Sequence, residues 1–501
     1  MLMVLRSEWT KLRTVRGWVL ALVAAGLVTV LIGGWAAAGP QGSCALIVNG
    51  RSAGPATCHQ HVLLGPGGEA VTDSFYLVSR PMTGNGGLIV RVTGLAGGTA
   101  ADDPGGQLAP GLQPWAKAGL IVKASPRPGS AYAAVMLTGR HGVRMQYDYT
   151  RDTAARPGPV SAAAPRWLRL DRSGDTLTGY DSADGRHWTL VATARLAHLP
   201  TVVRAGVFVA SPAAVAAQST SPTLALASFD HLRLTGARPG SAWRGTQVGG
   251  TRRAGAAGGF TPAPGGLTVR GSGDIAPAVA NSGGSKSADG GLAGLFAGLI
   301  VVTVVGTMFI TAEYRRGLIH TTLAATPRRG QVLAAKAIVI GLVTFVIGLA
   351  AAAIAVALGQ HLLYADGNYV LPMSWLTGLR VAAGSGALLA LAAVLALALG
   401  TILRRGAGPV TAVIALLVVP YFFTSPLAVL PAGAATWLLR VTPAAGFAAE
   451  QALTRYPQVA NSYTPEYGYY PLPPWAGLAV LAAWTALALA LALVLLRRRD
   501  T

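Results

Sequence analysis

The sequence lacks a phosphate-binding loop and is poor in acidic residues. A P-loop needs the spacing Gly-x-x-x-x-Gly-Lys-Ser/Thr, because its backbone amides and its lysine hold the phosphates. Residues 283–287, Gly-Gly-Ser-Lys-Ser, do not have that spacing. Residues 39–289 contain a single glutamate, Glu69, whereas a glycosidase needs two carboxylates with separate roles. The sequence therefore predicts that this chain hydrolyses neither ATP nor glycosidic bonds.

Apolar residues are abundant and gather in long blocks. Hydrophobic residues make up 52% of the chain, which is too apolar for one soluble globular protein. A bilayer core about 30 Å thick takes a helix of roughly 20 apolar residues, because lipid offers backbone groups no hydrogen-bond partners. Lys336 and Arg380 lie near the ends of two such blocks, where a long side chain can snorkel to the interface. Six transmembrane helices are predicted, at 17–38, 291–311, 333–358, 380–402, 409–430 and 475–496.

The net charge of +21 is unevenly placed. The predicted cytoplasmic segments carry many lysines and arginines, with Glu8, Glu313 and Asp500 as their acids. The two short loops on the other side, together with Arg380 at the start of the fourth predicted helix, carry as many acids as bases. This positive-inside asymmetry predicts a multi-pass protein of the plasma membrane, with both termini cytoplasmic and residues 39–289 extracytoplasmic. A scattered positive excess without a basic helix gives little support to nucleic-acid binding.

The first apolar block has two interpretations. Arg16, the apolar run and the small residues at 36–38 resemble a cleavable signal peptide. The run is longer than a usual signal core, so a retained anchor is favoured. Cys44 and Cys58 follow it on the predicted outer face. A disulfide between them would close a loop of about 15 residues, worth on the order of 3 kcal/mol; the alternative is two free thiols.

Residues 39–289 are predicted to form an all-β sandwich, jelly-roll-like, inserted between the first two transmembrane helices. Short β-branched and aromatic runs are divided by Gly, Pro and Asp turns, most clearly in 167–191, where Asp184-Gly185 supports a tight hairpin. Many strands without a convincing helix indicate a sandwich. Residues 236–289, rich in Gly, Ser and Ala, are predicted in part as a tether, with a last strand at 271–277 as the alternative.

Residues 65–240 resemble concanavalin A-like lectin/glucanase domains of bacterial surface proteins. The matching residues are Arg166 to Leu170, Arg172 to Asp175, Ser182 to Gly185, Trp188 and Ala227 to His231. The resemblance implies glycan binding, with Trp167, Tyr180 and Trp188 as candidate contacts. The alternative is that these rings fill the sandwich core. Four aspartates also cluster here and are explained by turn spacing, with a calcium site as the alternative: Asp171, Asp175, Asp181 and Asp184.

Residues 1–16 precede the first transmembrane helix. Leu5, Trp9, Leu12 and Arg16 share one side of a helix, which predicts a cytoplasmic interfacial helix with a tryptophan anchor. The same residues also fit a second interpretation, in which their positive charge is a signal that orients the following transmembrane helix. The candidate interfacial residues are Glu8, Trp9, Lys11 and Arg13.

Residues 312–332 lie between the second and third predicted transmembrane helices. Gly317 and Gly330 bracket a short amphipathic stretch, interrupted at Thr326-Pro327. Mechanical coupling to another protein requires a short, rigid cytoplasmic helix of this kind; the alternative is a solvated basic loop. The candidate coupling residues are Glu313, Tyr314, Arg315, Arg316, Arg328 and Arg329.

Together these two segments resemble permease subunits of the type-2 class of ABC exporters, especially those of high-GC Gram-positive bacteria. The resemblance rests on Glu-Trp-Thr-Lys-Leu-Arg at 8–13, Glu-Tyr-Arg-Arg-Gly at 313–317 and Pro-Arg-Arg-Gly at 327–330. It implies a coupling segment that meets a separate cytoplasmic ATPase, which carries ATP and Mg, while this chain has no cofactor of its own. It also implies a second permease subunit, identical or related, short helices within the outer segment 432–474, and a cytoplasmic tail at 497–501.

Two other classes of function compete with transport by an ABC exporter. A membrane-anchored surface receptor or cell-wall glycan-binding protein would use the helices only as an anchor, for which five later spans are excessive. A secondary transporter needs acidic or histidine residues within its spans, and the sequence places none in mid-membrane. The sequence does not identify the transported substrate.

Overall fold

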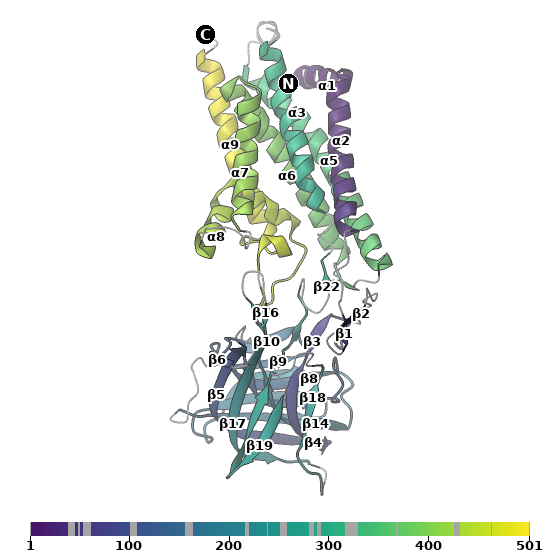
Figure 1. Cartoon of the computed structure of the whole chain (residues 1–501). Coiled ribbons are helices and arrows are strands. Elements are labelled where there is room, and N and C mark those ends of the chain that lie inside the picture. The colour runs from purple at the N-terminus through teal and green to yellow at the C-terminus, as the bar shows by residue number, and fades with distance from the viewer. Residues whose placement is uncertain are drawn as a thin grey trace. The chain divides into compact units, whose positions relative to one another are not determined.

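The computed structural model consists of two compact units (Figure 1). A helical unit combines Met1–Gln60, Lys286–Arg455 and Tyr463–Thr501, and a β unit combines His61–Ser285 with Tyr456–Ser462. The residues described are 2–38, 46–48, 51–53, 62–100, 108–155, 164–215, 220–237, 239–250, 258–279, 285–287, 292–315, 329–366, 369–424, 431–461 and 463–499.

Among the described residues, five helices are long and apolar enough to cross a membrane, which fits a membrane-embedded protein. They are α2 (Arg16–Ala37), α3 (Leu295–Arg315), α5 (Arg329–Ala365), α6 (Trp375–Leu403) and α9 (Pro474–Arg499). The span predicted at 409–430 corresponds to α7 (Ala407–Phe422), whose 16 residues fall short of the roughly 20 needed. Pro420 lies inside α7. Six spanning helices are therefore not established.

The helix α6 packs against α3, α5 and α9, and glycines bring it close to α3 and α5. A Cβ atom at Gly306 of α3 would lie 2.4 Å from the carbonyl oxygen of Ala393 in α6, and one at Gly348 of α5 would lie 3.0 Å from the Cα of Gly386. Helices surrounded by lipid associate by such close packing, because burial of apolar surface gives little gain there. These contacts make α6 the centre of the helical unit.

Three short helices precede α9. They are α8 (Ala432–Val441) and the 3₁₀ helix η2 (Pro443–Glu450), followed by η3 (Pro465–Tyr467). All eight residues of η2 are buried. Arg380 donates hydrogen bonds to the carbonyl oxygens of Ala449 and Gln451. It satisfies carbonyl groups at the end of η2 that the helix itself leaves unpaired.

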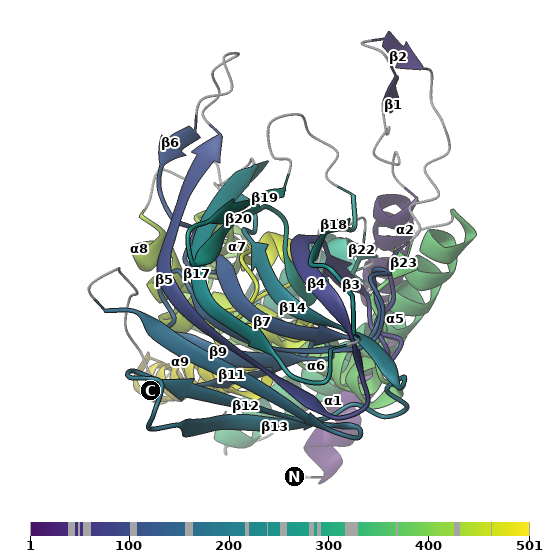
Figure 2. The ribbon, with the colours of Figure 1, turned by 90° about the horizontal axis from the view of Figure 1, so that it is seen from below.

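The β unit is a sandwich of two antiparallel sheets (Figure 2), as the sequence predicts. One sheet has the order β10 (Arg151–Ala154), β9 (Val143–Tyr147), β8 (Tyr132–Thr138), β7 (Lys117–Lys123), β14 (Val202–Ala210), β4 (Phe75–Thr83) and β18 (Arg244–Val248). The other has the order β13 (Thr189–Arg195), β12 (Thr176–Ser182), β11 (Arg166–Ser173), β5 (Gly86–Ala100), β17 (Thr223–Leu234), β20 (Gly266–Gly271) and β19 (Gly259–Ala263), with β6 (Leu108–Pro110) beside β5. Val78, Leu120 and Leu168 belong to the core between them. Strands β18, β19 and β20 lie within the segment predicted in part as a tether.

A further layer covers the outer face of the seven-stranded sheet. Strands β3 (Val71–Asp73) and β21 (Ile275–Pro277) pair with each other and pack on this face. Every residue of β7 and β8 is therefore buried, which explains their nearly continuous apolar sequences. The remaining short strands are β1 (Leu46–Val48), β2 (Arg51–Ala53), β15 (Ala214–Val215), β16 (Thr220–Ser221), β22 (Ser285–Lys286) and β23 (Tyr369–Val370).

Residues 456–461 belong to the β unit although they lie far from the rest of it in the sequence. Val459 is buried against Ala276 and Val279, and Tyr456 packs on the same cluster. The side-chain amide of Gln458 donates a hydrogen bond to the carbonyl oxygen of Thr150, at 3.5 Å. The segment that leads into α9 thus contributes buried side chains to the β unit.

Candidate functional site

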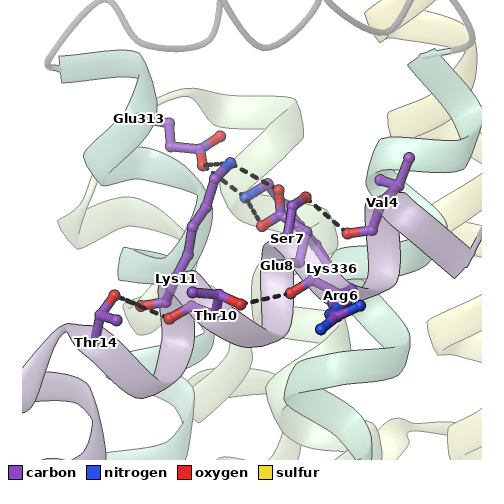
Figure 3. Close-up of polar contacts among 9 residues, drawn as sticks. All are labelled: Val4, Arg6, Ser7, Glu8, Thr10, Lys11, Thr14, Glu313 and Lys336. Atoms are coloured by element: carbon purple, nitrogen blue, oxygen red, sulfur yellow. Dashed lines mark hydrogen bonds and ion pairs between the residues drawn. The ribbon is translucent and has the colours of Figure 1, made fainter.

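Four charged side chains meet where α1 (Leu2–Thr14), α3 and α5 pack together (Figure 3). The Nζ atom of Lys336 in α5 lies 2.6 Å from Oε2 of Glu8 in α1 and 2.8 Å from Oε1 of Glu313 in α3. The Nζ atom of Lys11 lies 2.8 Å from Oε1 of Glu8 and 3.1 Å from Oε1 of Glu313. We call these four residues the ion cluster. It joins three helices by alternating charges.

The ion cluster is largely excluded from solvent. Lys336 is 0% exposed and Glu8 1% exposed, while the side chain of Lys11 is 38% exposed. Phe309 adds a ring 4.7 Å from the Lys336 ammonium, a favourable cation–π arrangement. The expectation that Lys336 snorkels to the interface is wrong. Two carboxylates compensate its charge inside the helix packing, so the side chain does not need to reach water.

The sequence of α1 explains why Glu8 points inward. Leu5, Glu8 and Leu12 are spaced by three and four residues, which places them on one side of a helix. Glu8 and Leu12 are the buried residues of α1, whereas Trp9 is 45% exposed. A helix forms over these residues, as the sequence predicts, but its buried side runs through Glu8 rather than Trp9. The exposed tryptophan is consistent with an anchor in the interface.

The candidate coupling residues do not all lie together. Glu313 belongs to the ion cluster, while the neighbouring Tyr314 ring lies 5.1 Å from the Arg404 guanidinium. Arg315 is exposed at the end of α3, and Arg329 donates from Nη1 to the carbonyl oxygen of Leu496 in α9, at 3.1 Å. Arg316 and Arg328 lie outside the described residues. So do Cys44 and Cys58, so the predicted disulfide stays a prediction.

Sequence reasoning missed the role of Lys336. A usable signal existed: Glu8 and Glu313 are isolated acids in otherwise basic segments, and Lys336 is an isolated base at the edge of an apolar block. Isolated charges of opposite sign near lipid are expected to pair. Arg13, also named as interfacial, is exposed and lies outside the ion cluster.

In the β unit, the candidate glycan contacts Trp167, Tyr180 and Trp188 are half-exposed and lie outside the sandwich core. Arg169 is the register partner of Tyr180, and its guanidinium lies 5.4 Å from the Tyr180 ring and 6.0 Å from the Trp188 ring. Arg91 lies 5.6 Å from the Trp167 ring. The structure therefore brings the three rings to one surface interleaved with arginines, and the alternative of core-filling rings is wrong.

Each of the two arginines beside these rings forms an ion pair with an aspartate. Arg91 binds Asp230 at 2.5 Å and Arg169 binds Asp171 at 2.6 Å. The hydrogen bond from Arg91 lowers the pKa of Asp230, so this carboxylate stays ionised. Planar charged groups beside aromatic faces can bind vicinal hydroxyl groups while the rings stack on apolar faces.

Three of the four clustered aspartates, Asp171, Asp181 and Asp184, have separate structural roles. Asp184 accepts hydrogen bonds from the backbone N–H groups of Arg186 and His187, at 2.8 and 2.9 Å. A side-chain hydrogen bond with His187 lowers the pKa of Asp184 and raises that of His187. Asp181 is buried beside Arg166. No group of three metal-ligating side chains forms among the described residues, and the turn explanation accounts for Asp184.

No known family profile and no curated protein sequence matches this chain. A functionally unknown protein from Saccharomyces cerevisiae is similar over 33% of this chain and 76% of its own, with 15% identity and a TM-score of 0.21. A GH43 protein from Bacillus licheniformis is similar over 30% of this chain and 27% of its own, with 13% identity and a TM-score of 0.21. Scytalido-glutamic peptidase is similar over 40% of this chain and 98% of its own, with 8% identity and a TM-score of 0.25. At such values these similarities assign neither family nor function.

Proposed function

We propose that this chain is the membrane-spanning permease subunit of an ATP-driven exporter and that residues 313–330 meet a separate cytoplasmic ATPase. The observation that supports the proposal is the ion cluster, which ties Glu313, at the start of this segment, to α1 and α5. A segment that receives force from another protein must be rigidly attached to the helices it moves. Buried, hydrogen-bonded charge pairs provide such an attachment.

The proposed assembly contains more than this chain. A second permease subunit, identical or related, completes the transport path, and ATP with Mg is bound by the ATPase partner. The protein sits in the plasma membrane with both termini and residues 313–330 on the cytoplasmic side, where the positive charges gather. The exported β unit then lies on the opposite side of the membrane.

Copurification tests this proposal. Membranes containing the protein should yield an ATP-binding-cassette protein in stoichiometric amounts. The exposed Arg315 at the end of α3 allows a charge reversal without loss of packing: Arg315→Glu combined with Arg328→Glu should reduce the copurified ATPase about tenfold, equivalent to about 1.4 kcal/mol. Arg233→Glu, an exposed reversal in the β unit, is the matched control and should change nothing. Undiminished association after replacement of the whole 313–330 segment contradicts the proposal.

A second candidate function is glycan binding at the cell surface, favoured by the surface that holds Trp167, Tyr180 and Trp188. Full-length protein in detergent should bind cell-wall polysaccharide, and Trp167→Ala or Trp188→Ala should each weaken binding about tenfold, because a stacked ring contributes on the order of 1 kcal/mol. Trp243→Ala is the control, since Trp243 also faces an arginine, Arg80 at 5.6 Å, elsewhere in the β unit. Equal binding by all variants excludes this surface.

A further inference from the structure

Strand β7 carries two lysines whose ammonium groups are buried against aspartates of the covering layer. Lys117 Nζ lies 2.6 Å from Oδ1 of Asp274, and Lys123 Nζ lies 2.7 Å from Oδ2 of Asp73. Asp73 ends β3, and Asp274 immediately precedes β21. These pairs therefore join the beginning and the end of the β unit to one central strand.

The two members of the Lys123–Asp73 pair both have side chains that are 0% exposed. The Lys123 ammonium also lies 5.6 Å from the rings of Tyr132 and Tyr149 and donates to the carbonyl oxygen of Ser130 at 2.9 Å. Burial lowers the pKa of Lys123. A neutral lysine amine is a good nucleophile, whereas the ammonium is not.

The Asp73 carboxyl group is held asymmetrically. Its Oδ2 atom accepts hydrogen bonds from Lys123, from the Tyr149 hydroxyl at 2.7 Å and from the Gly129 N–H at 2.8 Å. Its Oδ1 atom is buried and accepts none from the described residues. The Gly129 and Tyr149 donors are placed to stabilise negative charge on Oδ2 if a nucleophile adds to the carboxyl carbon.

A third carboxyl group, that of Asp148, directly precedes Tyr149, whose hydroxyl group contacts both Asp73 and Lys123. Asp148 and Tyr149 both have positive φ angles, 42° and 59°, a backbone conformation that non-glycine residues adopt only when the surroundings enforce it. Burial, followed by the charge of Glu69, raises the pKa of Asp148 to about 6, and the charge of Lys123 opposes this rise. A carboxyl group with such a pKa readily takes up and releases a proton near neutral pH.

We propose that Lys123 and Asp73 become joined by an intramolecular isopeptide bond. A proton passes from Nζ to the Asp73 carboxylate and is held on Oδ1, which gives a neutral amine and a neutral acid. Nζ then attacks Cγ, the N–C bond forms and the Cγ–Oδ1 bond breaks. Nζ gives up a second proton, which Asp148 carries to Oδ1. Oδ1 then holds this proton and the proton of the neutral acid, and it leaves as water. No oxidant or other reactant is needed.

The bond explains why the burial of this ion pair is tolerated. Two charges buried in a protein interior are expensive unless every lone pair and proton is satisfied, and Oδ1 of Asp73 is not satisfied by any described residue. An amide is neutral and removes that oxygen. The link closes a covalent loop of residues 73–123 and joins β3, the first strand of the covering layer, covalently to β7.

Mass spectrometry of the full-length protein tests the inference. Under reducing conditions the intact mass should be lower than the sequence mass by one water, and a tryptic digest should contain the peptide of Lys123 joined to the peptide of Asp73. Lys123→Arg should have the full mass and no joined peptide. Recovery of the two wild-type peptides unlinked, or a link at Lys117 in place of Lys123, overturns the proposal.

Lys117 serves as the internal control. Its Nζ atom bonds Asp274 and the carbonyl oxygen of Ile275, and in the described part of the chain it contacts neither a third carboxyl nor an aromatic ring. It should remain an ion pair. Asp148→Asn should leave cooperative thermal unfolding intact but abolish the joined peptide, an effect that a purely structural role of Asp148 does not produce. A link that still forms in Asp148→Asn overturns the proton path.

Discussion

Replacement of Lys336 by methionine should lower the stability of the helical unit by about 3–5 kcal/mol. The substitution keeps an unbranched side chain in α5 but removes the fully buried positive charge that contacts Glu8 and Glu313. Two carboxylates would then share only Lys11, whose side chain is partly in solvent. Thermal unfolding in detergent, together with the rate of protease cleavage within α1, measures the loss.

Two variants separate charge from packing at the ion cluster. Lys11→Met should destabilise by about 1 kcal/mol or less, because partly exposed ion pairs contribute little. Adding Glu313→Gln to Lys336→Met should restore part of the stability, because it removes one of the two uncompensated carboxylates. If Lys336→Met unfolds at the wild-type temperature, the ion cluster does not hold the three helices together.

Gly306→Leu should separate α3 from α6 and lower stability by about 1–3 kcal/mol or more. A Cβ atom at this position already lies 2.4 Å from the Ala393 carbonyl oxygen, and leucine adds three more carbons in the same direction. Glu313 lies two turns further along α3, so recovery of the ATPase partner should fall as well. The melting temperature and the yield of monodisperse protein are the measurements.

Gly17→Leu is the matched control for this substitution. Gly17 lies in the first turn of α2, and a Cβ atom added there would meet no described atom within 4 Å. The same increase in side-chain volume there should leave the melting temperature nearly unchanged. Equal effects at both positions would mean that general insertion of bulk, rather than the contact between α3 and α6, decides stability.

Much of the fold follows from local patterns. A run of roughly 20 apolar residues has only one low-energy state in lipid, and five of the six predicted runs form long helices. In the β unit, the alternation around Trp167 predicts β11, which pairs with β12, and the Asp184-Gly185 turn predicts the hairpin that pairs β12 with β13. Gly185 has a φ of 73°, a conformation that glycine adopts without strain.

Local sequence patterns do not indicate which distant segments of the chain pack together. Glu8 and Lys336 are 328 residues apart in sequence, and neither has a neighbour in the chain that identifies its partner. The sequence places Val459 in a loop segment, yet its side chain is buried against Ala276 and Val279. The apolar run at 409–430 also predicts a longer helix than α7, because apolar composition alone does not fix where a helix ends.

The packing of residues 456–461 into the β unit changes how the origin of this domain should be understood. A self-contained module can be moved between genes as one continuous stretch, whereas this domain takes side chains from a loop near the far end of its host. A fragment of residues 61–285 alone would therefore lack the side chains of Tyr456 and Val459 that pack on Ala276 and Val279.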